Sequence, residues 1–181
     1  MSDIDTTAKS VVVVGVDGSA GATAAFRWAL AEARLRKAPL RVVHAWTYGF
    51  AGGAAAGDAY FGYLASYPPL GNDVTDALRQ AAEEVLTAAI AEVVDGDADV
   101  RIERQLIEGG AAQILVGAVE PDDLLVVGSR GHGGFADLLL GSVSLQCVHH
   151  APCPVVVVHV PKQAPADDVG PAAGGTASAA S

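Results

Sequence analysis

The sequence predicts a doubly wound α/β domain, in which helices cover both faces of a five-stranded parallel sheet. Short apolar runs alternate with segments of helical periodicity as far as residue 160, and the connections between them are short. Several runs, such as residues 11–14 and 155–158, consist of valine alone. Continuous β-branched runs are typical of strands that are buried on both faces of a parallel sheet. Strands that alternate with helices favour parallel neighbours joined by right-handed crossovers.

Each predicted element has its own start or stop signal. Ser19 is a good N-cap for the first helix, and Pro39 prevents that helix from continuing into the second strand. Polar and apolar residues alternate over 100–106, so we place that strand, half exposed, at an edge of the sheet. Pro152 ends the last helix. In chain order we expect a strand at 11–16, a helix at 20–37, a strand at 40–45, a helix at 74–93, a strand at 100–106, a helix at 111–119, a strand at 124–127, a helix at 142–150 and a strand at 155–160.

Composition divides the chain into one domain, residues 1–161, and a tail, residues 162–181. The tail is rich in Pro, Ala, Gly, Ser and Asp, and it lacks the apolar residues that would offset the entropy of ordering, so we expect disorder there. Residues 47–71 show neither helical nor strand periodicity. We interpret them as a long surface loop, either a variable insertion or a lid over a ligand.

The net charge of −10 argues against a nucleic-acid partner, because a phosphate backbone would be repelled. Any anion site must therefore be local, built from backbone N–H groups and one or two cations. The first ten residues contain no signal-peptide segment and no apolar run is long enough to cross a membrane, so we expect a cytoplasmic protein without a membrane partner. Cys147 and Cys153 do not have the spacing of a redox pair.

The richest functional signal is the glycine-rich stretch that follows the predicted strand 124–127. Gly128 and Gly131 come directly after the strand, and Gly141 and Ser142 open the next helix. Glycines allow close approach of the backbone to a ligand, and a helix N-terminus offers free N–H groups. If the fourth strand lies on the other side of the first, its end adjoins Asp17 where the strand order reverses, which is where such sheets bind ligands. The sequence therefore predicts a phosphate-binding site.

Here Gly128 is followed after two residues by Gly131, and Gly131 is followed after nine residues by Gly141-Ser142. This spacing resembles the ATP-binding signature of the universal stress proteins. GVDGS at 15–19, VHA at 43–45, EGG at 108–110, LLVVGSRG at 124–131 and APCPVVVV at 151–158 also match this family. The resemblance implies a Rossmann-like fold similar to the adenine nucleotide alpha hydrolases, and it implies ATP, possibly with Mg²⁺, as the ligand. The residues that it implies for binding are Gly15, Asp17, Ala45, Val127, Gly128, Ser129, Arg130, Gly131, His132, Gly141, Ser142, Val143 and Ser144.

The resemblance also implies roles within that set. Asp17 and Ala45 would lie at the adenine and ribose end, and Val127 and Gly128 would line the nucleoside. The residues that would donate to the phosphates are Gly131, Gly141, Ser142 and Val143. Arg130 and His132 would supply cations in the loop. The sequence departs from the family pattern at Ala111, where a proline is common, and at His132, where a longer basic residue is common. A neutral His132 would weaken phosphate contact.

Other interpretations of the same residues stay open. The glycines could form a plain strand-to-helix connection, and Asp17 could be only a turn residue. A catalytic triad of Ser19, His44 and Asp17 is a weak alternative, as is a zinc site among Cys147, His149, His150 and Cys153. We expect a nucleotide-dependent regulator of a stress or dormancy response with no catalytic residues. A slow ATP hydrolase or nucleotidyl-transferring enzyme, a cyclic-nucleotide-binding protein and an interaction protein with an empty cleft are the alternatives.

The last predicted strand, from Val155 to Val160, would leave an apolar edge with unpaired backbone groups. Pairing with the same strand of a second chain removes this hazard. The family resemblance implies the same contact, and we therefore expect a homodimer through this strand.

Overall fold

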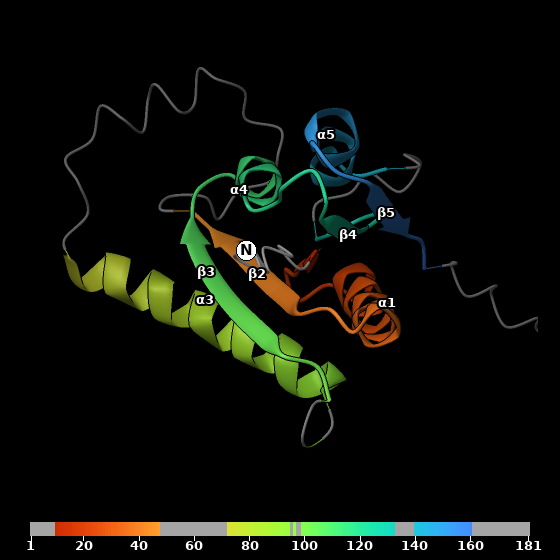
Figure 1. The fold of residues 1–181 in the computed structure, drawn as a ribbon. Helices are drawn as coiled ribbons and strands as arrows, with labels where there is room; N and C mark the ends of the chain where they lie inside the picture. Colours follow the sequence, from red (N-terminus) through yellow and green to blue (C-terminus); the bar gives the residue numbers. More distant parts are fainter. Residues whose placement is uncertain (1–9, 48–71, 95, 97–98, 133–139, 161–181) are drawn as a thin grey trace, which may run out of the picture.

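A computed structural model describes residues 10–47, 72–94, 96, 99–132 and 140–160. Within these residues the chain forms one five-stranded sheet with helices on both of its faces (Figure 1). Helices α1 and α3 lie below the sheet in that view, and α4 and α5 lie above it. The predicted fold class is therefore confirmed.

The first βαβ unit consists of β1 (Val12–Gly15), α1 (Ala20–Arg36) and β2 (Leu40–Trp46), and its two strands pair in parallel. The Ser19 hydroxyl caps α1 by accepting a hydrogen bond from Ala22 N at 3.2 Å. The helix ends at Lys37, whose left-handed backbone (φ 53°) lets its N–H reach the carbonyls of the last turn. These signals confirm the predicted cap and place the end of the helix two residues before Pro39.

The rest of the chain repeats the alternation of strand and helix. α3 (Asn72–Val93) leads to β3 (Ile102–Glu108), α4 (Ala111–Gly117) leads to β4 (Leu124–Gly128), and α5 (Ser142–His150) leads to β5 (Val155–Val158). All nine predicted elements are present. The main differences are at their ends: α3 starts two residues earlier than predicted, β3 starts and finishes two residues later, α4 finishes at Gly117 rather than at 119, and β5 finishes at Val158 rather than at Val160.

The strand order is β3-β2-β1-β4-β5, and every pair is parallel. The chain moves outward from β1 to β2 and β3, then returns to place β4 on the other side of β1, where Val12 pairs with Leu124. The order therefore reverses between β1 and β4, and this point is the expected ligand crevice of a doubly wound sheet. β3 lies at one edge, as its alternating sequence predicts.

Two apolar layers hold the helices on the sheet, and neighbouring residues of β1 alternate between them. Val12 and Val14 pack with Phe26 of α1 and Leu86 of α3 on one face, whereas Val13 faces the α4–α5 layer. β1 is buried because helices cover both of its faces, which explains its unbroken valine sequence. The central strands are thus rigidly supported up to their carboxyl ends, where the predicted site lies.

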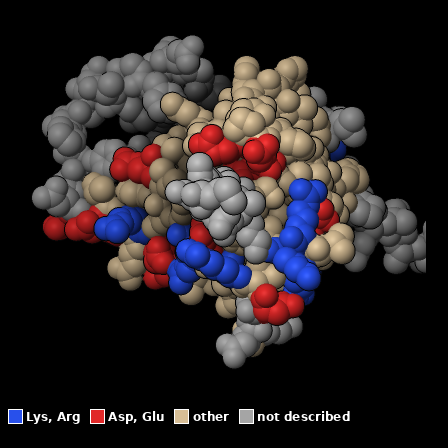
Figure 2. All heavy atoms as spheres, viewed as in Figure 1, with Lys and Arg blue, Asp and Glu red and all other residues tan. Residues whose placement is uncertain are grey.

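Ion pairs join the outer elements. Arg34 of α1 pairs with Asp99 at 2.8 Å, and Arg104 of β3 pairs with Glu83 of α3 at 2.6 Å. Figure 2 shows basic and acidic side chains interspersed on one face of the molecule. No helix among the described residues is long and apolar enough to span a membrane. The predicted loop at 47–71, apart from Thr47, and the predicted tail at 162–181 lie outside the described residues.

Candidate functional site

The carboxyl end of β1 turns sharply into α1 at Asp17 and Gly18. Gly18 has φ +81°, a conformation that side chains other than hydrogen rarely allow. Asp17 Oδ1 accepts a hydrogen bond from Ser19 N at 2.9 Å, which fixes the carboxylate beside the start of the helix. Asp17 is thus a turn residue, as one interpretation of the sequence holds, and its second oxygen, Oδ2, does not take part in that turn.

β4 ends against the first turn of α1. A Cβ built on Gly128 would lie 2.7 Å from the backbone carbon of Gly21, so the strand can approach the helix this closely only with glycine. A Cβ on Gly21 would in turn meet the carbonyl oxygen of Arg130. The segment that follows β4, Gly128 to Gly131 (the glycine loop), therefore lies directly over the N-terminus of α1.

Gly131 completes this contact between the two strand ends. A Cβ on Gly131 would collide with Asp17 Oδ2, so the loop backbone lies against the carboxylate. His132 follows, and its Nε2 lies 3.0 Å from the carbonyl oxygen of Asp17, to which it donates. The structure thus brings Asp17, Gly131 and His132 together at the reversal of strand order, as the sequence predicts for Asp17 and the glycines.

Ser129 connects the glycine loop to β5 and to α5. Its N–H donates to Val158 O at 2.7 Å, and its carbonyl oxygen accepts from Gly141 N at 2.8 Å and from Ser144 Oγ at 3.1 Å. Its hydroxyl lies 3.1 Å from His159 Nδ1. Ser129 is only 5% exposed. It therefore fixes the start of α5 relative to the end of β4.

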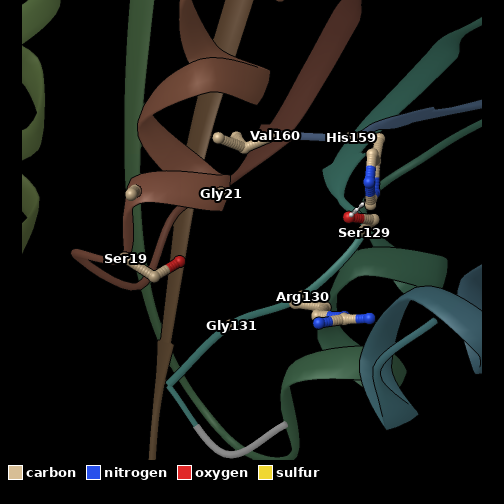
Figure 3. A pocket seen from close by; sticks show the side chains of 8 residues that line it. Ser19, Gly21, Ser129, Arg130, Gly131, His159 and Val160 are labelled. Atoms are coloured by element: carbon tan, nitrogen blue, oxygen red, sulfur yellow. Dashed lines mark hydrogen bonds between the residues drawn. The ribbon is translucent and has the colours of Figure 1, made fainter. Parts of the chain in front are cut away.

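Arg130 lies on the α5 side of the glycine loop. Its Cα is 3.6 Å from the position that a Cβ on Gly141 would occupy, and Gly141 is the N-cap of α5. In Figure 3 its guanidinium is directed away from Ser19. The Nε atom is buried and has no hydrogen-bond partner among the described residues. Beside it, Ser142 is exposed at the first turn of α5 and Val143 is half-buried. A guanidinium whose Nε lacks a partner among the described residues, beside a helix N-terminus, is suited to an anionic ligand.

The four remaining predicted residues are buried or half-buried. A Cβ on Gly15 would lie 2.8 Å from Leu115 of α4, so this glycine admits a helix side chain. Val127 is buried in the α4–α5 layer, and Ser144 is buried with its hydroxyl bonded to backbone carbonyls. Ala45 is half-buried near the end of β2. Val127 and Ser144 can contribute to a ligand site through backbone groups and through the position of their neighbours.

The surroundings of His44, Cys147 and Cys153 favour structural roles over the alternative catalytic triad and zinc site. His44 Nδ1 donates to Val16 O at 2.7 Å, and Ser19 Oγ accepts from a helix N–H, so both have structural partners other than each other. Burial raises the pKa of the Cys147 thiol to about 11, and it also raises the pKa of Cys153. Protonated, buried thiols are inert, and their position in the α4–α5 core is that of packing residues.

A pocket of about 540 Å³ opens beside the glycine loop, on the side of α1 and β5. Figure 3 shows Ser19 on one side of it and the paired His159 and Ser129 on the other. We call it the α1–β5 pocket; it is lined by Ser19, Ala20, Gly21, Ser129, Arg130, Gly131, His159 and Val160. The sequence pattern does not predict Gly21 or His159 as site residues. For Gly21 a local signal exists: glycine lowers helix stability, so a glycine in the first turn of a helix indicates a close contact that requires it.

Comparisons with known proteins agree with this architecture. The model of the universal stress protein family matches residues 10–159. A universal stress protein of Mycobacterium bovis is 33% identical over 153 residues, which are 82% of this chain and 47% of the relative. One of Mycolicibacterium smegmatis is 30% identical over 161 residues, which are 86% of this chain and 50% of the relative. This chain thus spans about half the length of these curated relatives.

Among solved structures, the universal stress protein UspA of Lactobacillus plantarum superposes with a TM-score of 0.61 at 22% identity. The match covers 83% of this chain and 97% of that protein, and it shows that the two share a fold. The family model covers every described strand. The chain belongs to the universal stress protein family.

Proposed function

We propose that the protein binds ATP, with Mg²⁺ accompanying the phosphates, and that the bound nucleotide regulates a stress or dormancy response. The observation that carries the proposal is the contact of Gly131 with the carboxylate of Asp17, which leaves no room for a side chain. Glycine at this position lets the loop backbone pass through the crevice where the strand order reverses, so that it can approach a ligand closely.

The groups around this contact fit a nucleotide. The N-cap of α5 is Gly141, which has no side-chain cap, so N–H groups of the first turn remain for phosphate oxygens. Arg130 adds a cation whose Nε lacks a partner among the described residues. Asp17 Oδ2 would accept a hydrogen bond from a ribose hydroxyl or an adenine amine. Local positive groups of this kind are needed because the chain carries a net charge of −10.

Substitution of Gly131 by alanine tests the proposal. The new methyl group would force the loop backbone or the Asp17 carboxylate to move, and we expect the affinity for ATP to fall at least tenfold, which corresponds to about 1.4 kcal/mol. Isothermal titration with ATP, with Mg²⁺ present, measures the affinity. Gly117→Ala is the matched control, because a Cβ at Gly117 meets no atom within 4 Å.

Circular dichroism and urea denaturation of both variants report whether the fold is intact. An unchanged ATP affinity in a folded Gly131→Ala protein would show that this contact does not form the nucleotide site. Nucleotide released from heat-denatured wild-type protein would identify the ligand that the protein retains from the cell. Release of a cyclic nucleotide or of AMP alone would replace ATP in the proposal.

A further inference from the structure

The α1–β5 pocket shares Ser129, Arg130 and Gly131 with the proposed nucleotide site and extends from them toward α1 and the end of β5. Arg130 and Gly141 are on the α5 side, whereas Ser129 directs its hydroxyl to His159 at the end of β5. Ser19 and Gly21 of α1 form the facing wall (Figure 3). The nucleotide-binding residues named above account for the loop itself, but not for His159 or for this wall.

None of the described residues that line the α1–β5 pocket is acidic. The chain as a whole contains 21 acidic residues and 11 basic ones. The side chains that it presents are two hydroxyls, one imidazole and small apolar groups, and Arg130 belongs to the same lining. The lining presents no carboxylate and includes Arg130, so this pocket repels an anion less than the acidic parts of the surface do.

His159 can present a directed donor to this pocket. Its Nδ1 lies 3.1 Å from Ser129 Oγ, and Ser129 is held in place by three further hydrogen bonds to Val158, Gly141 and Ser144. When the Ser129 hydroxyl donates to Nδ1, the proton of a neutral imidazole resides on Nε2, which is then a donor for a ligand. His159 itself is exposed, so a ligand can reach it.

We propose that the α1–β5 pocket is a second anion site that accepts a phosphate group, and that His159, the residue after β5, binds it. The Ser19 hydroxyl faces His159 across the pocket and would contact the same group from α1. The phosphate is either a free inorganic anion or the distal group of a bound nucleotide. This site goes beyond the proposed ATP site, because it adds His159, which follows β5, and the start of α1 to loop residues that both sites share.

Nuclear magnetic resonance of isotope-labelled, full-length protein tests the site with inorganic pyrophosphate as the probe. We expect the imidazole signals of His159 to shift in a saturable manner. The signals of His149, which is exposed on α5 and does not line the pocket, should remain unchanged. Absence of a saturable shift at His159 with both pyrophosphate and ATP would overturn the proposal, as would an equal shift at His149.

Two variants separate this site from the proposed nucleotide site. In His159→Gln, the affinity for pyrophosphate, read from the Ser129 amide signal, should fall at least fivefold. Ser19→Asp adds a carboxylate to the pocket, and the affinity read from the His159 signals should fall by the same factor. His149→Gln is the matched control and should change the affinity less than twofold. Wild-type affinity in His159→Gln, with the native circular dichroism spectrum, would refute the role of His159 while leaving the ATP proposal intact.

The source of the phosphate is distinguished by repeating the titration with ATP-saturated protein. Competition between ATP and pyrophosphate at His159 would place the distal phosphate of the nucleotide in the α1–β5 pocket. Simultaneous binding would identify a free anion as the ligand. Both results retain the pocket as an anion site, and a protein that binds pyrophosphate at His159 but no ATP would refute only the nucleotide proposal.

Discussion

Asp123 is a buried carboxylate that joins the end of α4 to the start of β1. It is 7% exposed; Oδ1 accepts from Val11 N at 2.8 Å, and Oδ2 accepts from Glu120 N at 2.9 Å. Asp123→Ala would leave both N–H groups without these partners, and we expect the free energy of unfolding to fall by about 3 kcal/mol. Urea denaturation monitored by circular dichroism measures this loss.

The neighbouring residue provides the control for Asp123. Asp122 is exposed, and Asp122→Ala removes the same charge from the chain without removing a buried acceptor. We expect its effect on unfolding to stay within about 0.5 kcal/mol. Equal losses in the two variants would mean that charge, rather than the two buried hydrogen bonds, accounts for the contribution of Asp123.

The positions of some candidate-site residues can be predicted from the sequence, whereas those of others cannot. Asp17 and Gly131 follow strands whose order is set by short connections, so their proximity could be predicted from topology alone. His159 could not, because its contact with Ser129 spans 30 residues and depends on β5 ending level with β4. The position of Arg130 relative to α5 likewise follows from the path of the loop, which residue spacing leaves open.

At the scale of elements, the sequence pattern predicts that a strand or helix is present better than it predicts the residue at which the element ends. The valine runs of β1 and β5 and the alternation of β3 locate three strands, because burial of one or both faces imposes a distinct pattern on each. The end of β5 is set by a contact instead of by this pattern. The strand ends at Val158, and the next residue, His159, turns its imidazole to Ser129, so Val160 lies beyond the strand despite its apolar side chain.

α1 depends on Ser19 both for its cap and for one wall of the α1–β5 pocket. Ser19→Ala removes the acceptor of Ala22 N, and we expect the free energy of unfolding to fall by about 1 kcal/mol. Ser19→Asp retains a capping oxygen and places a negative charge at the positive end of the helix, so its stability should stay within about 0.5 kcal/mol of wild type. Urea denaturation of both variants measures the two effects.

The pair of Ser19 variants is informative because one substitution retains a capping oxygen and the other removes it. A Ser19→Asp protein as unstable as Ser19→Ala would mean that the hydroxyl acts through the pocket or through Asp17 rather than as a cap. In that case the turn formed by Asp17 Oδ1 and Ser19 N would be the structure that holds the start of α1.

For the whole molecule, the outer edge of β5 is one of the two sheet edges that have no partner strand among the described residues, and β3 forms the other. All four residues of β5 are half-buried, and the strand pairs with β4 on one side. Leu125 N donates to Pro154 O and Ser129 N donates to Val158 O, so the backbone groups of Val155 and Val157, between them, are directed outward. This edge would be covered by the β5 strand of a second chain, which is the predicted homodimer.

Val157→Pro tests that assembly, because it removes an outward N–H while leaving the residues that pair with β4 in place. Sedimentation velocity at micromolar concentration should show a dimer for wild type and a monomer for the variant. The variant must retain the circular dichroism spectrum of wild type, since loss of β5 would also separate the chains. A monomeric wild-type protein would contradict the dimer directly. A dimeric, folded Val157→Pro protein would show that the chains associate through another surface, and β5 would then owe its half-burial to its own helices alone.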